Sequence, residues 1–191
     1  MRFAAAALLA FATCNSLRAR ELRVCWADQT GMSQVTFESF VQELAILLED
    51  TGLQVRWEAC AVPPEPNTVR LSVLPSPRAT HKSALGVAYV SDSEVLPVIE
   101  LYLKRLSEYL GWRRSPYVIG RALARVAAHE LAHYVLQDPG HESDGLLRPR
   151  FPEWMLADPD PAPFRMALRA DLFPHAARSS PLIPTGSGSG R

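Results

Sequence analysis

The sequence predicts an α+β fold in which one five-stranded sheet packs against two main helices. Short segments of alternating apolar and polar residues recur up to residue 101 and are typical of strands. Two longer segments, 33–52 and 115–138, repeat apolar residues at the three- and four-residue spacing of a helix. The first of these separates two strands, and a β-helix-β order favours a right-handed crossover between parallel strands.

The composition suits one domain of moderate size. The chain has 191 residues, of which 48 % are apolar and 21 % charged, so it can bury a sizeable core. Its 20 basic and 20 acidic residues cancel, and without a basic run we expect no binding to nucleic acid or to an anionic membrane surface. We expect the domain over residues 20–173, a flexible tail over 174–191 with a final Gly-Ser-Gly-Ser-Gly-Arg run, and a monomeric protein.

Residues 1–19 are typical of an export signal. Met1-Arg2 gives a positive start, residues 3–12 form an apolar core, and Leu17-Arg18-Ala19 is an acceptable cleavage site. Because the apolar run is too short to anchor the chain in a bilayer, we expect a secreted or periplasmic protein without stable membrane insertion. The alternative is lipid attachment at Cys14, which the atypical Thr before it disfavours.

The elements can be assigned in chain order. Strands are expected where apolar and polar residues alternate or a short apolar run occurs, at 22–26, 54–59, 69–73, 85–90 and 95–101. The first helix begins after Ser33, a suitable N-cap, and ends at Gly52. Its apolar stripe, which includes Phe40 and Leu44, is typical of core packing. A short helix is expected over 103–110.

Cys25 and Cys60 remain once the export signal is removed. In an oxidising compartment two cysteines usually pair, and this pair would close a loop of 34 intervening residues. Such a bridge stabilises a fold by roughly 3–4 kcal/mol in the chain-entropy model. The alternative is two buried thiols on strands, and metal ligation is disfavoured because both lie far from the histidines in sequence. We therefore predict a disulfide.

Residues 129–141 carry the strongest functional signal. They read His-Glu-Leu-Ala-His-Tyr-Val-Leu-Gln-Asp-Pro-Gly-His and hold three of the five histidines in the chain. His129 and His133 stand four residues apart, so a helix places their imidazoles on one face, about 6 Å apart. Asp138-Pro139-Gly140 ends the helix and allows His141 to turn back as a third nitrogen ligand. Three imidazoles and a water form the open tetrahedral site of a catalytic zinc.

Glu130 lies between the two helical histidines, on the adjacent flank of the helix. There it can reach a metal-bound water without displacing it, as a general base would. The motif therefore predicts a zinc hydrolase that cleaves peptide bonds. The alternative is a surface helix with solvated histidines, since short runs of this kind also occur by chance. Asp144 and Glu153 compete with His141 as third ligand, because zinc also accepts carboxylates.

Other polar residues near the motif carry weaker expectations. Asp138 and Asp144 could accept hydrogen bonds from the imidazole N–H groups, although Asp is also favoured in turns. Neither Tyr134 nor Arg148 can be assigned to oxyanion stabilisation, and Tyr134 could simply pack. No Gly-rich phosphate loop and no Gly-x-Ser-x-Gly elbow is present, so nucleotide use and serine hydrolysis have no support.

Sequence patterns outside the motif predict less. Phe151 to Trp154 is an apolar patch that we expect to pack under the site. Phe164 to Leu172 could form a short helix. The remaining histidines, His81 and His175, are expected at the surface.

The residues around the motif resemble the metzincin class of zinc peptidases, in which a helical His-Glu motif is followed by a third His and a methionine-containing turn. The segment is more similar to a group of small exported bacterial matrixin-like proteins, whose third His comes eight residues after the second and begins a His-Ser-x-x-Gly-Ile-Met run. Here that run is His141-Glu142-Ser143-Asp144-Gly145-Leu146-Leu147, so Leu147 stands at the methionine position. A Gly-x-x-Val-x-Trp-x-x-Cys segment of the same group matches residues 52–60.

The resemblance covers residues 22–152 and implies a twisted mixed sheet with the zinc motif on the second main helix. It also implies that residues 85–90 form an antiparallel edge strand along the cleft, where unpaired backbone groups could hold an extended peptide. The alternative is an ordinary edge protected by the Pro-rich loop at 75–77. Two departures stand out, a His133 to His141 spacing longer by two residues than in typical metzincins, and Leu in place of Met. Because that methionine is not a ligand and Leu is similar in volume, zinc binding is compatible with the exchange.

Two functions follow from the sequence. The first is an exported zinc metallopeptidase that acts on a peptide or protein substrate, with one catalytic Zn²⁺ and Glu130 as general base. The alternative is a catalytically inactive, zinc-stabilised extracytoplasmic domain that binds a peptide or protein. Both hold the metal through His129, His133 and His141. Glu130 favours the enzyme, because a structural site would need a fourth protein ligand in place of the water.

Overall fold

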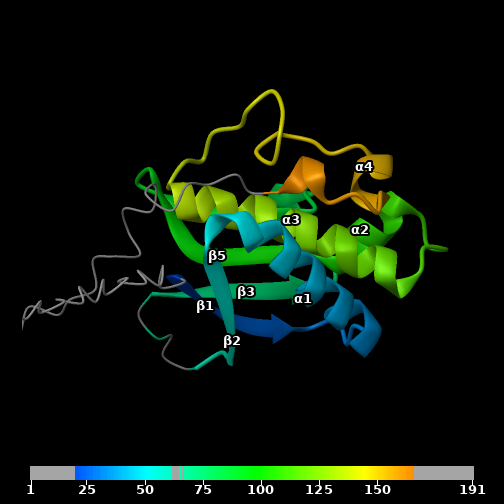
Figure 1. Cartoon of the computed structure of the whole chain (residues 1–191), viewed down its shortest axis with the longest axis horizontal. Helices are drawn as coiled ribbons and strands as arrows, with labels where there is room; N and C mark the ends of the chain where they lie inside the picture. The colour runs from blue at the N-terminus through cyan, green and yellow to red at the C-terminus, as the bar shows by residue number, and fades with distance from the viewer. Residues whose placement is uncertain (1–19, 62–64, 66, 166–191) are drawn as a thin grey trace, which may run out of the picture.

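A computed structural model describes residues 20–61, 65 and 67–165 of the chain. It confirms an α+β architecture, with one mixed five-stranded sheet and helices packed against it (Figure 1). The strands are β1 (Arg20–Asp28), β2 (Leu53–Ala59), β3 (Thr68–Leu74), β4 (Gly86–Ser91) and β5 (Glu94–Tyr102). The helices are α1 (Gln34–Leu48), α2 (Leu103–Leu110), α3 (Pro116–Leu136) and α4 (Glu153–Ala157), with 3₁₀ turns at Glu49–Thr51, Ala79–His81 and Ala162–Phe164. All five predicted strands are present and differ from the prediction by one or two residues at their ends.

The two main helices begin where the sequence predicts. The Ser33 side chain accepts a hydrogen bond from the backbone N–H of Thr36 at 3.2 Å and caps α1. Ser115 caps α3 in the same way through Val118, at 3.4 Å, and Pro116 occupies the first helical position. Gly52 has a φ of 68° and follows the 3₁₀ turn that extends α1. Local capping chemistry therefore determines both starts.

Helix α3 ends earlier than predicted. It was expected to continue to residues 138–140, but its last residue is Leu136, and Gln137 adopts a left-handed φ of 53°. The Gln137 side chain accepts a hydrogen bond from the backbone N–H of Val95 and donates one to its carbonyl, each at 3.0 Å. This tertiary contact with β5 favours the left-handed residue at 137 and closes the helix before the Pro-Gly pair.

The sheet has the order β2-β1-β3-β5-β4. Strand β1 pairs in parallel with β2 and β3, and β3 pairs in parallel with β5, whereas β4 runs antiparallel to β5. A two-residue turn joins β4 to β5, and both turn residues, Asp92 and Ser93, have positive φ. The register of β4 shifts between Ala88 and Val90. β4 is therefore the antiparallel edge strand that the resemblance implies.

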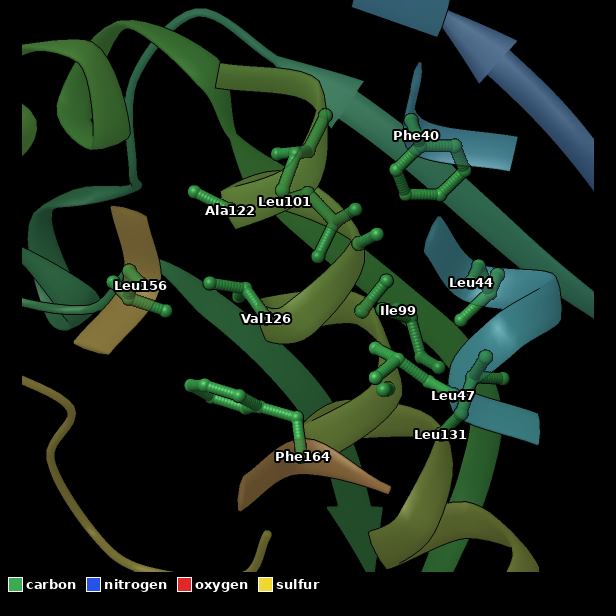
Figure 2. Close-up of a cluster of buried hydrophobic side chains, with 14 of the residues drawn as sticks. Phe40, Leu44, Leu47, Ile99, Leu101, Ala122, Val126, Leu131, Leu156 and Phe164 are labelled. Atoms are coloured by element: carbon green, nitrogen blue, oxygen red, sulfur yellow. The ribbon is translucent and has the colours of Figure 1, made fainter. Parts of the chain in front are cut away.

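Helices α1 and α3 pack against each other and against one face of the sheet (Figure 1). Figure 2 shows side chains from both helices meeting β5 in one cluster, including Leu44, Leu47, Val126, Leu131, Ile99 and Leu101. Burial of each large apolar side chain contributes about 1.5–3 kcal/mol. Gly120 allows a close approach of the two helices, because a Cβ there would lie 2.8 Å from Ser39 Cβ and 3.0 Å from Phe40 N. The core therefore fixes α3, which carries the histidines, against the sheet.

Cys25 and Cys60 form the predicted disulfide, which links β1 to the residue after β2. The expected export signal at 1–19 and tail at 174–191 lie outside the described residues, as does most of the helix expected at 164–172, of which Phe164 belongs to a 3₁₀ turn. Within the described ranges, no helix has the length and apolar character needed to cross a membrane.

Candidate metal centre

The structure brings together the three histidines that the sequence selects. His129 and His133 project from α3 and are buried, with exposed fractions of 8 % and 5 %. Their ring centroids lie 4.6 Å apart. His141 is exposed, and its ring centroid lies 5.4 Å from that of His129 and 5.0 Å from that of His133. One nitrogen from each ring lies within 4.8 Å of the other two. The alternative of solvated surface histidines is therefore wrong for His129 and His133.

Backbone carbonyls fix the orientation of both buried rings. Nδ1 of His129 lies 2.7 Å from the carbonyl oxygen of Leu146, and Nδ1 of His133 lies 2.7 Å from that of Asp138. Because a carbonyl can only accept, each Nδ1 carries the hydrogen of a neutral imidazole. Nε2 of each ring is then a bare acceptor. This tautomer is the one that directs a lone pair of each ring to a shared point, as metal-binding histidines require.

The two Nε2 atoms face each other at 3.1 Å. With both hydrogens on Nδ1, no proton lies between these atoms, and two lone pairs at this distance repel. A cation between them would convert the repulsion into two bonds. Nitrogens bound to one zinc at 2.0–2.1 Å in tetrahedral geometry stand roughly 3.3 Å apart. The donor set thus fits a single metal ion.

The buried environment keeps the two rings neutral. Desolvation lowers the pKa of His129 to about 4, helped by the nearby His133 and His141 and opposed by the Leu146 carbonyl. Desolvation also lowers the pKa of His133, with the Asp138 carbonyl opposing it. Both Nε2 atoms are therefore unprotonated at neutral pH, which is the form that binds a metal.

Glu130 lies beside the histidines and is also buried, with an exposed fraction of 7 %. Its Oε2 accepts a hydrogen bond of 2.8 Å from the backbone N–H of Ala88 on β4. Desolvation raises the pKa of Glu130 to about 7, and the Ala88 N–H opposes this shift. A carboxyl group of that pKa can both take and release a proton near neutral pH.

The edge strand passes directly over the motif. A Cβ at Gly86 would lie 2.7 Å from Val126 Cγ1 and 3.1 Å from both Cγ and Oε1 of Glu130. Only glycine therefore lets β4 approach α3 this closely. Sequence reasoning did not select Gly86, because the contact joins residues about forty positions apart and leaves no periodic signal.

Apolar side chains form the floor of the site. Leu147 is 7 % exposed and belongs to the main core. The Phe151 ring is buried, with its centroid 5.5 Å from that of His129. Phe151 thus packs beneath the site as expected. Trp154 does not, since it is 67 % exposed while α4 buries Met155 and Leu156.

The acidic residues near the motif serve turns and surface ion pairs. The backbone carbonyl of Asp138 contacts His133, whereas its carboxylate accepts from the N–H of Gly140 at 2.7 Å. The Asp144 carboxylate accepts from the N–H of Gly145, and Glu153 pairs with Arg114 at 2.7 Å. In the part of the chain that the structure describes, neither Asp144 nor Glu153 joins the histidine cluster.

The structure describes two of the three weaker candidates, Tyr134 and His81, and not His175. Tyr134 is half-buried and packs against the core, and burial raises its pKa. His81 was expected at the surface but is half-buried, with its ring 6.1 Å from that of Tyr89, so that prediction is only partly right. His175 lies outside the described residues.

Arg125 is a structural residue that sequence reasoning missed. It lies on α3 one turn before His129, is completely buried, and donates a hydrogen bond to Glu43 at 2.8 Å. It also donates to the backbone carbonyls of Met155 and Asp160, at 2.8 Å and 3.0 Å. Arg125 thus holds the segment 155–160 against α3. The sequence signal that could have identified Arg125 is a charged residue among the apolar positions that α3 buries.

A cavity of about 630 Å³ is lined by all four candidate side chains, namely His129, Glu130, His133 and His141. Residues 83–88 of the edge strand and the loop before it line one wall. Residues 148–151 with Arg105 and Tyr109 line another. The histidine cluster, as a candidate metal site, therefore lies in a cavity beside the sheet edge.

No protein family model matches the chain, and comparison with curated proteins and with solved structures likewise gives no match. The functional conclusion therefore rests on the geometry and chemistry of the residues in this cavity.

Proposed function

We propose that this protein is an exported zinc-dependent peptidase, in which His129, His133 and His141 hold one catalytic Zn²⁺ and Glu130 is the general base. The observation that carries the proposal is the convergence of three imidazole nitrogens beside a buried carboxylate with a pKa raised to about 7. Three neutral imidazoles with an open fourth position are a common zinc donor set in hydrolases.

When bound, zinc supplies a Lewis acid and makes its coordinated water easier to deprotonate. Glu130 would take that proton. The Ala88 N–H occupies Oε2, which leaves Oε1 as the proton acceptor. Burial keeps the carboxylate out of bulk water, so that the proton stays near the reacting groups and can pass to the leaving amine.

The edge strand supports a polypeptide as substrate. Gly86, Val87 and Ala88 of β4 line the cavity, and only one side of β4 pairs with β5. An extended peptide could add to the free side through backbone groups of β4 other than the Ala88 N–H, which Glu130 engages. This mode of binding requires no deep pocket and suits a small domain.

The Cys25–Cys60 disulfide supports an oxidising compartment, and with the predicted export signal it favours a secreted or periplasmic location. We also propose that the protein is a monomer without a lipid anchor at Cys14.

A zinc-stabilised binding domain without activity is the second candidate. The rings of His129 and His133 contact carbonyls at both ends of the loop 138–146, so a metal here would also stabilise that loop against α3. Such a domain would use the same histidines and would not need Glu130.

The deciding experiment compares the zinc-loaded native protein with Glu130→Gln on a mixed peptide library. Glu153→Gln is the matched control, because Glu153 is an exposed carboxylate outside the cavity. We expect native protein and control to cleave, and Glu130→Gln to be slower by about 100-fold or more at equal zinc content. Loss of cleavage in all three proteins, each with one zinc bound, would refute the peptidase and favour the binding domain.

A further inference from the structure

Three arginines line the cavity that contains the histidines. Arg105 comes from α2, and Arg148 and Arg150 come from the loop before α4. Among the described lining residues, Glu130 is the only carboxylate, and the Ala88 N–H already engages it. The cavity therefore has an excess of positive charge even before a metal binds.

These arginines differ in their partners from most other arginines in the described ranges, although Arg70 and Arg113, which do not line the cavity, also have no ion pair there. Seven arginines pair with a carboxylate in the described ranges, namely Arg23, Arg56, Arg78, Arg114, Arg121, Arg125 and Arg165. Arg105, Arg148 and Arg150 have no ion pair within those same ranges. Nε of Arg105 is buried without a hydrogen-bond partner among the described residues, and the side chain of Arg148 makes a 3.4 Å contact with the sulfur of Met155.

The arginine-bearing loop is fixed next to the metal centre at both of its ends. Leu146, two residues before Arg148, accepts the Nδ1–H of His129 at 2.7 Å. Phe151, one residue after Arg150, packs its ring against His129, and its carbonyl accepts from the Tyr109 hydroxyl at 2.8 Å. Arg105 stands one helical turn before Tyr109 on α2. The three cations therefore lie on elements that meet beside His129.

A guanidinium group that lines a partly enclosed cavity without a counter-ion attracts an anion strongly. Arginine presents a planar fork of donors that matches a carboxylate, and the bond gains strength where water is excluded. Positive charge on several walls also raises the local concentration of anionic ligands. A peptide offers this chemistry in Asp and Glu side chains and in its C-terminal carboxylate.

We propose that Arg105, Arg148 and Arg150 recognise a carboxylate of the substrate, so that the protein cleaves peptides beside an acidic residue or close to a free C-terminus. This inference rests on the proposed peptidase function and adds its substrate class. The carboxylate lies at the arginine-lined end of the cavity, while the peptide backbone follows β4.

The test measures binding of peptide hydroxamates to the zinc-loaded protein by calorimetry, with the hydroxamate anchoring each ligand at the metal. One pair has a Glu or a Gln side chain next to the anchor and an amidated C-terminus. A second pair has Ala there and a free or an amidated C-terminus. We expect the acidic member of at least one pair to bind about 10-fold more tightly or better. The pair that responds distinguishes side-chain recognition from chain-end recognition.

Arg105→Gln and Arg150→Gln should each reduce this preference severalfold. Arg113→Gln is the matched control, because Arg113 is exposed and outside the cavity, and it should leave the preference unchanged. Two independent variants keep the test valid if one fails to fold. Equal affinities for acid and amide in both pairs would overturn the inference, as would a preference that persists in both variants.

The measurement needs no catalysis, so it is repeated on Glu130→Gln. An acidic preference in both proteins, with no cleavage by the zinc-loaded native protein, would retain the recognition site and refute the peptidase. Cleavage of peptides by a protein that binds acid and amide equally would refute the recognition site alone.

Discussion

The backbone N–H of Ala88 donates a hydrogen bond of 2.8 Å to the carboxylate of Glu130. This bond joins the edge strand β4 to the middle of α3, at the residue that follows His129. The position of the strand and the orientation of the carboxylate are therefore coupled. A substitution that shifts β4 should therefore change the orientation of the Glu130 carboxylate and leave the three histidines in place. This coupling can be tested.

Gly86→Ala should impair cleavage without loss of metal. The new Cβ would lie 2.7 Å from Val126 Cγ1 and 3.1 Å from Glu130 Oε1, so strand or carboxylate must shift. Because a misplacement of about 1 Å can cost 100-fold in rate, we expect kcat to fall by about 10-fold to 100-fold, measured on the best library peptide. Zinc affinity should change by less than about threefold. Adding Val126→Ala removes the closest contact and should restore part of the rate. An unchanged kcat in Gly86→Ala would contradict the close approach.

Glu130→Gln should stabilise the metal-free protein above neutral pH. The pKa of Glu130 is raised from 4.5 to about 7, so the folded state holds its proton more tightly than the unfolded state. Its contribution to stability is complete below pH 4.5 and is lost as pH rises through 7. A shift of one pKa unit corresponds to 1.36 kcal/mol. The unfolding free energy of the variant should therefore exceed that of the native protein by up to about 3 kcal/mol at pH 8 and by almost nothing at pH 4.5.

Urea unfolding in the presence of a chelator measures this difference. The lowered pKa of His129 affects both proteins equally and cancels in the comparison. A chelator is needed because a bound cation would lower the pKa of the carboxyl group. A difference in unfolding free energy that does not vary between pH 4.5 and pH 8 would show that Glu130 is not desolvated.

Gly120→Ala should destabilise the fold although alanine favours helices by about 1 kcal/mol. A Cβ at this position would contact backbone atoms of α1, including the carbonyl oxygen of Thr36 and the nitrogen of Phe40 at 3.0 Å. These backbone atoms of α1, unlike a flexible side chain, cannot rotate away from the new Cβ. We therefore expect a loss of about 1–3 kcal/mol in the unfolding free energy, measured by urea denaturation. Tyr117→Ala, an exposed change one turn earlier, should stay within about 0.5 kcal/mol. A Gly120→Ala protein as stable as the native one would refute the tight α1–α3 contact.

Arg125→Met should cost about 3–5 kcal/mol of stability, because it removes one member of a buried ion pair. Glu43 would be left with the longer contact to Arg121, at 3.9 Å, and the carbonyls of Met155 and Asp160 would lose their donor. Chemical denaturation of the single variant and of Arg125→Met/Glu43→Leu checks this. The double variant should recover part of the loss. If the single variant unfolds at the native denaturant concentration, Arg125 does not hold the C-terminal segment.

The sequence was sufficient where local rules determine the structure. Ser33, Ser115 and Pro116 cap or begin helices through contacts within one turn, so both helix starts were predictable. The spacing of His129 and His133 places both rings on one face wherever the helix forms. His141 follows a Pro-Gly pair that cannot continue a helix, which made its return toward the other two a sound expectation.

The sequence was insufficient where contacts between residues far apart in the chain determine the structure. Gln137 ends α3 through Val95, Ala88 engages Glu130, and Arg125 reaches carbonyls about thirty residues later. None of these contacts leaves a periodic pattern, because each depends on how α3 lies against the sheet. The lack of ion pairs at the cavity arginines, within the described residues, is equally a tertiary property, since it depends on which carboxylates the fold brings near them.

The proposed metal centre requires three imidazoles to bind one zinc, and X-ray absorption of the protein loaded with one equivalent of zinc tests this directly. We predict three imidazole nitrogens at 2.0–2.1 Å with one further oxygen, and loss of one imidazole from the spectrum of His141→Ala. A native spectrum with fewer than three imidazoles, or an identical spectrum in His141→Ala, would contradict the proposed metal centre.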